Sequence, residues 1–394
     1  MPTINRLIKK WYGSPFLSGG NDMSTATPTS STITARTQFL RAKNETYAYR
    51  RFGHGPGHPL LCLQHFMGTL DNWDPAVTDA LASGREVILF DNAGVGRSTG
   101  NVPDTVREMA THALAFLDGL GVTICDVLGF SLGGMIAQQI AQDRPSMFRR
   151  MILVGTAPRG GEDIMHLEKP TLAKPLSDST LRGYAVLQKI FFAPTESSQA
   201  AGQAFIERLA QRKEDLEPAS GPGVARAQMA SFREWEQFTG TRFADLKSIR
   251  QPALVVNGVH DEMIPVSNSY SLGEHLPNAV LLTYPDSGHG SSVPVSRVAS
   301  RARRPRFSHR TLRSRPTEPP GDCHDSNKRG PTYVDQRQRA PQYLGSGDPA
   351  LKDYFPAWVN NMADDATVEG SMLNGVVQGA EAVRSVVVTY PLAV

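Results

Sequence analysis

Residues 127–134 have the sequence VLGFSLGG, and this short stretch decides the fold. It joins an apolar run at 125–129 to a helical pattern at 132–142. A Gly-x-Ser-x-Gly motif in that position is typical of a sharp strand-to-helix turn with the serine at its apex. Its glycines let the flanking backbones approach closely. The motif therefore predicts that Ser131 projects above a sheet, at a helix N-terminus that favours developing negative charge.

Buried strands alternate with helices on both sides of this turn. Short, nearly continuous apolar runs are expected for strands that are buried on both faces of a parallel sheet. The predicted strands are 46–52, 59–66, 86–91, 125–129, 151–156, 253–257 and 279–284, with a helix at 104–120. Strands that alternate with helices indicate an α/β fold with a mostly parallel, doubly wound sheet. Reactive groups in such sheets collect at the carboxyl ends of the strands.

A long interval separates the strand at 151–156 from the strand at 253–257, and it contains three helical patterns, at 180–192, 196–212 and 224–238. We expect these helices to form a cap at about 158–248, over the strand ends. Its aromatic residues could line a substrate cavity, but packing between helices is favoured because large apolar side chains dominate cores. The candidate pocket residues, with packing as the alternative, are Met67, Trp73, Phe191 and Trp235.

A serine nucleophile needs a base that is held by an acid, and two downstream loops supply both. His289 lies in the loop Ser-Gly-His-Gly at 287–290, and Asp261 lies just after the strand at 253–257. The order Ser131, Asp261, His289 is the one expected for a nucleophile-elbow fold. The rivals for the acid or its partner are His260, Glu262 and Asp286. Position directly after the strand favours Asp261.

Together these motifs make residues 37–290 resemble an α/β-hydrolase of the single-domain, cap-bearing kind that includes serine esterases and haloperoxidase-like enzymes. The segment DNAGVGRS at 91–98 matches a turn that is usually structural in that family. The resemblance places the oxyanion loop at 64–68, where this chain has His65-Phe66 in place of the common His-Gly. It implies that the backbone N–H groups of Phe66 and Leu132 form the oxyanion hole.

The ends of the chain differ in composition from its centre. Residues 1–36 are basic and rich in serine and threonine, which predicts a disordered leader; a mitochondrial presequence is the weaker interpretation. No run of apolar residues is long enough for a transmembrane helix. The three cysteines, Cys62, Cys125 and Cys323, cannot form a disulfide framework, so we expect a reducing, cytoplasmic location.

Residues 297–339 contain eleven Arg and one Lys against four acidic residues, a net charge of +8 that leaves −5 for the rest of the chain. We interpret 291–346 as a disordered Arg- and Pro-rich linker. Nucleic-acid binding is the weakest interpretation, because no aromatic residues are interleaved with the basic ones. The segment stands where the family has a final helix, whose loss would loosen the loop that positions His289. An abrupt change of composition at Ser291 also suggests translated intron or out-of-frame sequence.

Composition becomes globular again at 347–394, where GAEAV at 379–383 and the segment before it resemble the start of a SnoaL-like (nuclear-transport-factor-2-like) domain. The resemblance covers only part of such a domain. We therefore expect a truncated α+β fragment that is too short to bury its own core and has no catalytic role.

The sequence as a whole predicts a serine hydrolase that cleaves an ester, thioester or lactone of a small or medium apolar molecule through an acyl-enzyme. The alternatives are acyl transfer, cofactor-free perhydrolysis and a non-catalytic ligand-binding protein that keeps the pocket. No metal cluster or phosphate-binding loop occurs in the sequence, so we expect no metal and no cofactor. The expected partner is a small acyl substrate, neither a membrane nor nucleic acid, and the sequence defines no oligomeric state.

Overall fold

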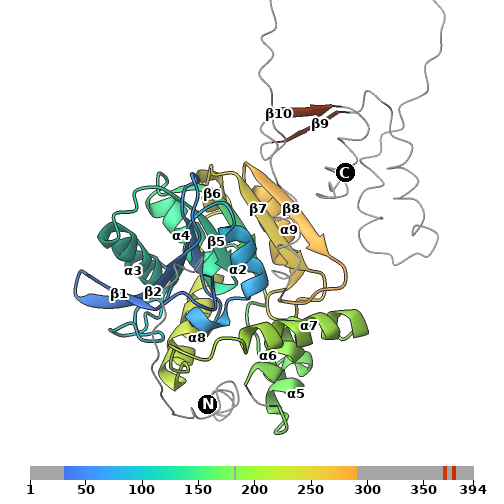
Figure 1. Ribbon diagram of the computed structural model, residues 1–394. Helices are drawn as coiled ribbons and strands as arrows, with labels where there is room; N and C mark the ends of the chain where they lie inside the picture. Colours follow the sequence, from blue (N-terminus) through green and yellow to red (C-terminus); the bar gives the residue numbers. More distant parts are fainter. Residues whose placement is uncertain (1–30, 182, 291–366, 371–374, 379–394) are drawn as a thin grey trace, which may run out of the picture. The chain divides into compact units, whose positions relative to one another are not determined.

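The computed structural model describes residues 31–181, 183–290, 367–370 and 375–378. An eight-stranded sheet with the order β1-β2-β4-β3-β5-β6-β7-β8 forms its centre (Figure 1). Strand β2 pairs antiparallel with β1 and β4, and all other neighbours are parallel. The predicted α/β class is therefore confirmed. The strands are β1 (Gln38–Ala42), β2 (Glu45–Phe52), β3 (Leu60–Leu63), β4 (Val87–Phe90), β5 (Cys125–Phe130), β6 (Phe148–Val154), β7 (Ala253–Gly258) and β8 (Ala279–Tyr284).

The central parallel strands end at one edge of the sheet. Leu63 of β3 pairs with Gly129 of β5, which in turn pairs with Leu153 of β6. Every residue of β3, β4, β5 and β7 is buried, as the continuous apolar runs predict. Because the registers align, the loops that follow β3, β5, β6 and β7 lie next to one another.

Helices with one apolar face cover the sheet. Helix α3 (Val106–Gly119) buries Val106, Met109 and Phe116, and Thr105 caps it by accepting a hydrogen bond from the Glu108 N–H. Helix α3 packs beside α4 (Leu132–Asp143), and α9 (Val266–His275) packs on β7 and β8. The short elements η1 (Leu70–Asn72) and α2 (Pro75–Ala82) follow β3.

The interval between β6 and β7 holds α5 (Pro170–Ser177), α6 (Tyr184–Phe191), α7 (Glu196–Leu209), α8 (Pro222–Glu236) and η2 (Ala244–Ser248). Figure 1 shows α5 to α8 gathered at one end of the sheet. Arg208 of α7 forms a two-bonded ion pair with Asp74, whose two bonds are 2.7 Å each. The Trp235 indole N–H of α8 donates to the Ala157 carbonyl at 3.1 Å. Direct contacts thus tie these helices to loops at the strand ends.

The ordered fold begins earlier in the chain than position 37. Thr32 and Ala35 are buried, and the Thr32 N–H donates to Asp79 Oδ1 at 2.7 Å. The Arg212 guanidinium donates to the Thr32 and Ala35 carbonyls. Residues 31–36, which composition assigned to the leader, are therefore held by α2 and by the segment after α7.

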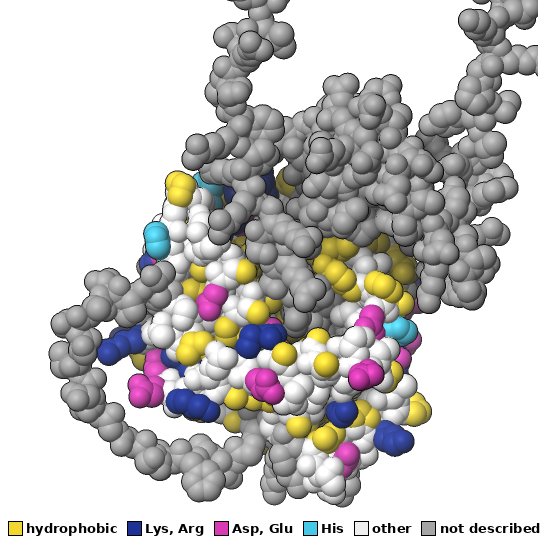
Figure 2. All heavy atoms as spheres, turned by 45° about the vertical axis from the view of Figure 1, so that its right-hand side comes forward, with side chains coloured by type: hydrophobic (Ala, Val, Ile, Leu, Met, Phe, Trp, Pro, Cys, Tyr) yellow, Lys and Arg dark blue, Asp and Glu magenta, His cyan; other side chains and the backbone are white. Residues whose placement is uncertain are grey.

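The linker predicted at 291–346 and most of the fragment predicted at 347–394 lie outside the described residues. Within that fragment, β9 (Thr367–Gly370) and β10 (Gly375–Gln378) form a two-stranded sheet. The SnoaL-like resemblance is not supported, because the rest of the fragment lies outside the described residues. None of the described helices has the length and apolarity needed to span a membrane. On the face shown in Figure 2, acidic and basic side chains are interspersed and do not gather by sign.

Candidate active site

Ser131 occupies a strained turn between β5 and α4. Its backbone has φ 55° and ψ −117°, a conformation that non-glycine residues rarely adopt. The Ser131 N–H donates to the Val154 carbonyl at 2.8 Å, and Thr156 Oγ1 donates to the Ser131 carbonyl at 2.7 Å. The neighbouring strand β6 and the loop after it therefore hold this turn in place.

The two motif glycines are required by close backbone contacts. A Cβ atom on Gly133 would lie 2.0 Å from the Leu63 carbonyl oxygen. A Cβ on Gly129 would lie 2.5 Å from the Gly133 carbonyl oxygen. Both distances are far below van der Waals contact, so the predicted role of these glycines is confirmed.

His289 is paired with Asp261 in the interior. His289 Nδ1 lies 2.8 Å from Asp261 Oδ2, and the other carboxylate oxygen accepts the N–H groups of Met263 and Ile264, each at 2.9 Å. Because an ionised carboxylate only accepts hydrogen bonds, Nδ1 must carry a proton and donate it. A neutral His289 therefore presents Nε2 as an acceptor.

The rival side chains point elsewhere. His260 and Glu262 are exposed, and Glu262 accepts a hydrogen bond from Thr171 Oγ1 at 3.1 Å. Asp286 accepts hydrogen bonds from Thr195 and Ser197, each at 2.5 Å, at the start of α7. Those two hydrogen bonds lower the pKa of the Asp286 carboxyl. Of the four candidates, Asp261 is the one that contacts His289.

Ser131 and His289 are both fully buried. Within the part of the chain that the structure describes, neither Ser131 Oγ nor His289 Nε2 has a hydrogen-bond partner. The His289 ring lies against Phe130 and Phe191, with ring centroids 5.1 and 5.3 Å apart. Hydrogen bonds between catalytic groups are often long before substrate binds, so the serine and histidine remain candidates to act together.

Gly155, which follows β6, lies beside this histidine and was not identified from the sequence. It has φ 52°, and a Cβ atom there would lie 3.2 Å from His289 Nδ1. A side chain at this position would therefore push on the imidazole ring. A glycine directly after an apolar, strand-like run is the sequence signal that could have found it.

The loop that is expected to hold the oxyanion follows β3. His65 is buried, and its Nδ1 donates to the Phe66 carbonyl at 2.9 Å. Burial is the main cause that lowers the pKa of His65 to about 3, with a smaller contribution from His289, so His65 is neutral near pH 7. Leu132 is the first residue of α4, where backbone N–H groups lie beyond the reach of the helix's own carbonyls. The two expected oxyanion donors, Phe66 and Leu132, thus follow adjacent strands.

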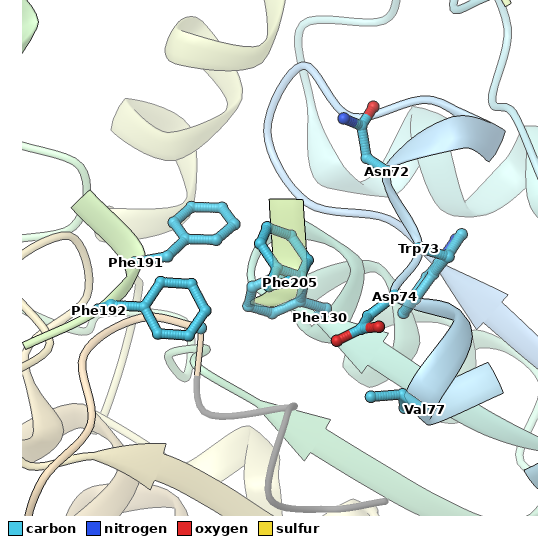
Figure 3. A pocket seen from close by; sticks show the side chains of 9 residues that line it. Asn72, Trp73, Asp74, Val77, Phe130, Phe191, Phe192 and Phe205 are labelled. Atoms are coloured by element: carbon cyan, nitrogen blue, oxygen red, sulfur yellow. The ribbon is translucent and has the colours of Figure 1, made fainter. Parts of the chain in front are cut away.

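Two small cavities adjoin these residues. One, of about 10 Å³, is lined by Asn72, Trp73, Asp74, Val77, Phe130, Phe191, Phe192, Phe205 and Gly290. Figure 3 shows Phe191 and Phe192 on one side of it and Trp73, Asp74 and Val77 on the other. The second, of about 30 Å³, is lined by residues that include His65, Leu132 and Gln228.

The candidate pocket residues have different environments. Trp73 and Phe191 line the first cavity. Trp235 is buried outside both linings, with the Arg159 guanidinium 4.3 Å from its ring centroid, so it packs α8 onto the loop after β6. Met67 is buried as well and also lies outside both linings. Its N–H donates to the Gln228 side chain, a contact that the sequence did not suggest.

The turn at 91–98 contains a buried acid. Ser98 Oγ donates to the Asp91 carbonyl at 2.7 Å and accepts from the Ala48 N–H, as expected of a structural turn. Burial, followed by the nearby carboxylates of Glu217 and Asp71, raises the pKa of the Asp91 carboxyl well above its usual value. Within residues 31–290 as described, neither Asp91 carboxyl oxygen forms a hydrogen bond of normal geometry.

Among the described residues, no cluster of His, Cys, Asp or Glu has the arrangement of a metal site. Cys62 and Cys125 are buried free thiols, and burial raises the pKa of the Cys125 thiol to about 12. These two cysteines therefore act as small apolar side chains.

Comparison with known proteins identifies the family. The family model described as the alpha/beta hydrolase fold matches residues 58–293. The chain belongs to this family. A solved structure from Chitinophaga pinensis, described as an alpha/beta hydrolase fold protein, is 40% identical to this hydrolase with a TM-score of 0.64 and covers 69% of this chain and 97% of its own. A hydrolase from Pseudomonas aeruginosa is 25% identical with a TM-score of 0.52, over 68% and 96% of the two chains.

Proteins named "Putative carbamate hydrolase RutD" are similar in sequence. The one from a Caulobacter species is 30% identical over 223 residues, which are 56% of this chain and 80% of the relative. The one from Variovorax paradoxus is 28% identical over 255 residues, which are 63% of this chain and 92% of the relative. The prediction of an enzyme of the hydrolase class is confirmed at this level.

Proposed function

We propose that this hydrolase cleaves an ester, thioester or lactone of a small or medium apolar molecule, with Ser131 as nucleophile, His289 as base and Asp261 as the acid that orients the base. The observation that carries the proposal is the buried contact of 2.8 Å between His289 Nδ1 and Asp261 Oδ2. This contact sets the tautomer of His289 in which Nε2 can accept a proton. The His289 ring also lies against Phe130, the residue before the strained turn at Ser131.

In the proposed reaction, Ser131 Oγ attacks the carbonyl carbon while His289 Nε2 takes the hydroxyl proton. The negative charge on the carbonyl oxygen is held by the N–H groups of Phe66 and Leu132. The tetrahedral intermediate collapses, the bond to the leaving group breaks, and His289 returns the proton to the leaving oxygen or sulfur. Water then repeats the sequence on the acyl-enzyme, which releases the acid and restores Ser131.

The lining of the first cavity supports an apolar substrate group. Four phenylalanines and Trp73 surround it, and its one acidic side chain, Asp74, is neutralised by the two-bonded pair with Arg208. The lining of this cavity therefore presents no unpaired charged side chain to a ligand. Such a surface binds alkyl or aromatic groups through burial of apolar area.

Carbamate hydrolysis is the second candidate, and the names of the similar proteins favour it. A carbamate and an ester place the same carbonyl carbon before the nucleophile, so the residues keep their roles. The two are separated by comparing an aryl acetate with the aryl carbamate of the same leaving group. Higher kcat/KM for the carbamate would select the second candidate.

The test is labelling of the full-length protein with a fluorophosphonate probe, together with turnover of p-nitrophenyl acetate and butyrate. Ser131→Ala should abolish both signals. Ser267→Ala, an exposed serine on α9, is the matched control and should retain them. A folded wild-type protein that neither reacts with the probe nor turns over either ester would refute the proposal and indicate a ligand-binding protein.

A further inference from the structure

Gln228 of α8 is hydrogen-bonded to the oxyanion loop. Its Oε1 accepts the Met67 N–H at 2.7 Å, and the contact is buried. A backbone N–H can only donate, so the facing atom of Gln228 must be its carbonyl oxygen. A carboxamide carbonyl thus accepts the N–H of the residue that directly follows Phe66, one of the two donors that the proposed function assigns to the oxyanion.

Helix α8 lies across the loops that flank Ser131. The residues that face these loops are spaced by four and three positions, so they share one face of the helix. Gln228 contacts Met67, and the ring centroids of Phe232 and Phe66 are 5.8 Å apart. Met67 and Phe66 both belong to the loop after β3. Trp235 reaches the loop after β6. Strand β5 lies between β3 and β6, so this face of α8 spans the strand that directly precedes Ser131.

The site is closed in this arrangement. Ser131 and His289 have no exposed surface, and Gln228 is 5% exposed. Gln228 and Leu132 line the same cavity, whose volume of about 30 Å³ holds only about two water molecules. Met67 itself has φ 58°, a strained backbone that is kept where the surroundings enforce it. A substrate therefore cannot enter without displacing side chains at this point.

We infer that the Met67 N–H is a further oxyanion donor beside those of Phe66 and Leu132, and that Gln228 holds this N–H in the resting enzyme and must release it before an oxyanion binds there. The inference rests on the proposed function. One N–H makes one strong hydrogen bond, so the Gln228 oxygen competes with the substrate oxygen. An oxyanion is a stronger acceptor than a neutral amide, whereas a neutral ester carbonyl is not. Competition from Gln228 therefore weakens the binding of the neutral substrate more than it weakens the stabilisation of the transition state.

Three variants of the full-length protein test this role through KM, kcat and the second-order rate of fluorophosphonate labelling. Gln228→Met keeps the length of the side chain but offers only a weak acceptor. Gln228→Glu keeps an acceptor and adds a negative charge beside the developing oxyanion. Gln188→Met, a glutamine of α6 that donates to the Gln199 carbonyl, is the matched control.

We expect Gln228→Met to lower KM and raise the labelling rate by roughly 3- to 10-fold, the range that one hydrogen bond supports, with kcat changed less. Gln228→Glu should reduce both rates, and Gln188→Met should match the wild type. A residue that only braces the loop would instead give slower labelling and lower kcat in Gln228→Met.

Two outcomes overturn the inference in distinguishable ways. Slower or unchanged labelling of Gln228→Met, with an active wild type, rejects the role of Gln228 and leaves the proposed function intact. A wild type whose Ser131 neither reacts nor turns over substrate rejects both. Melting temperatures of all variants establish that the rates are compared between folded proteins.

Discussion

His289 Nδ1 and Asp261 Oδ2 lie 2.8 Å apart, although 28 positions separate the two residues in the sequence. Asp261 is fixed by the Met263 and Ile264 amides, and His289 is enclosed by Phe130 and Phe191. The orientation of the imidazole therefore depends on a carboxylate that cannot turn away. This dependence makes the pair the most direct target for mutation.

Asp261→Asn should lower kcat/KM by about 10³- to 10⁴-fold, because the amide can stabilise the wrong tautomer of His289 and cannot balance the imidazolium charge. Steady-state turnover of p-nitrophenyl acetate measures the effect. Glu262→Gln changes the exposed neighbouring acid and should stay within about twofold of the wild type. Equal losses in the two variants would argue that Asp261 acts through the fold of its loop.

Gly155→Ala should reduce kcat by roughly tenfold or more, because its Cβ would displace the His289 ring. Gly121 provides a control with similar backbone strain, since it has φ 74° and a Cβ added there would meet no atom within 4 Å. Both substitutions should cost about 1 kcal/mol of stability or somewhat more. Gly121→Ala should keep wild-type kcat, and a parallel loss of kcat in both would contradict the role of Gly155.

The sequence was sufficient for features that are encoded locally. Apolar runs, helical periodicity and the glycines around Ser131 predicted strands β2 to β8, the α/β class and the turn, whereas β1 was not predicted. Loops after strands also pointed to Asp261 and His289, because the carboxyl ends of parallel strands meet at one edge. The catalytic roles of these residues stay predictions until a variant is measured.

The sequence was insufficient where distant segments meet. The contact between Met67 and Gln228 joins positions 161 residues apart, and no local pattern specifies such a pairing. Gln228 does stand out as a buried polar residue within the apolar face of a helix. Trp235, in contrast, could not be assigned from the sequence, because composition alone does not distinguish an aromatic residue that packs helices from one that lines a pocket.

Asp91→Asn should stabilise the protein increasingly as pH rises from about 5 to 8. The raised pKa of Asp91 means that the folded state holds a proton that the unfolded state has released, so wild-type stability falls with pH in that window. An asparagine side chain does not titrate, so the variant lacks this loss of stability as the pH rises. Thermal unfolding of both proteins at several pH values gives the difference.

Asp118→Asn is the control for this titration. Its hydrogen bonds to Arg144 lower the pKa of Asp118, so the stability that it contributes is lost only as pH falls through that lowered pKa. Its effect on the melting temperature should therefore be constant between about pH 5 and 8. A pH-independent difference for Asp91→Asn as well would show that Asp91 is ionised in the folded protein.

Phe192→Leu should shift chain-length preference toward longer acyl or alkyl groups. Phe192 lines the aromatic cavity, and its replacement adds space for at least one methylene, which is worth roughly 1–3 kcal/mol in such pockets. The ratio of kcat/KM for p-nitrophenyl butyrate to that for the acetate should then rise by about fivefold or more. Phe238→Leu alters an exposed aromatic residue beyond the end of α8 and should leave the ratio unchanged. If both variants keep the wild-type ratio, the substrate does not reach this cavity, and the apolar group must bind elsewhere in the site.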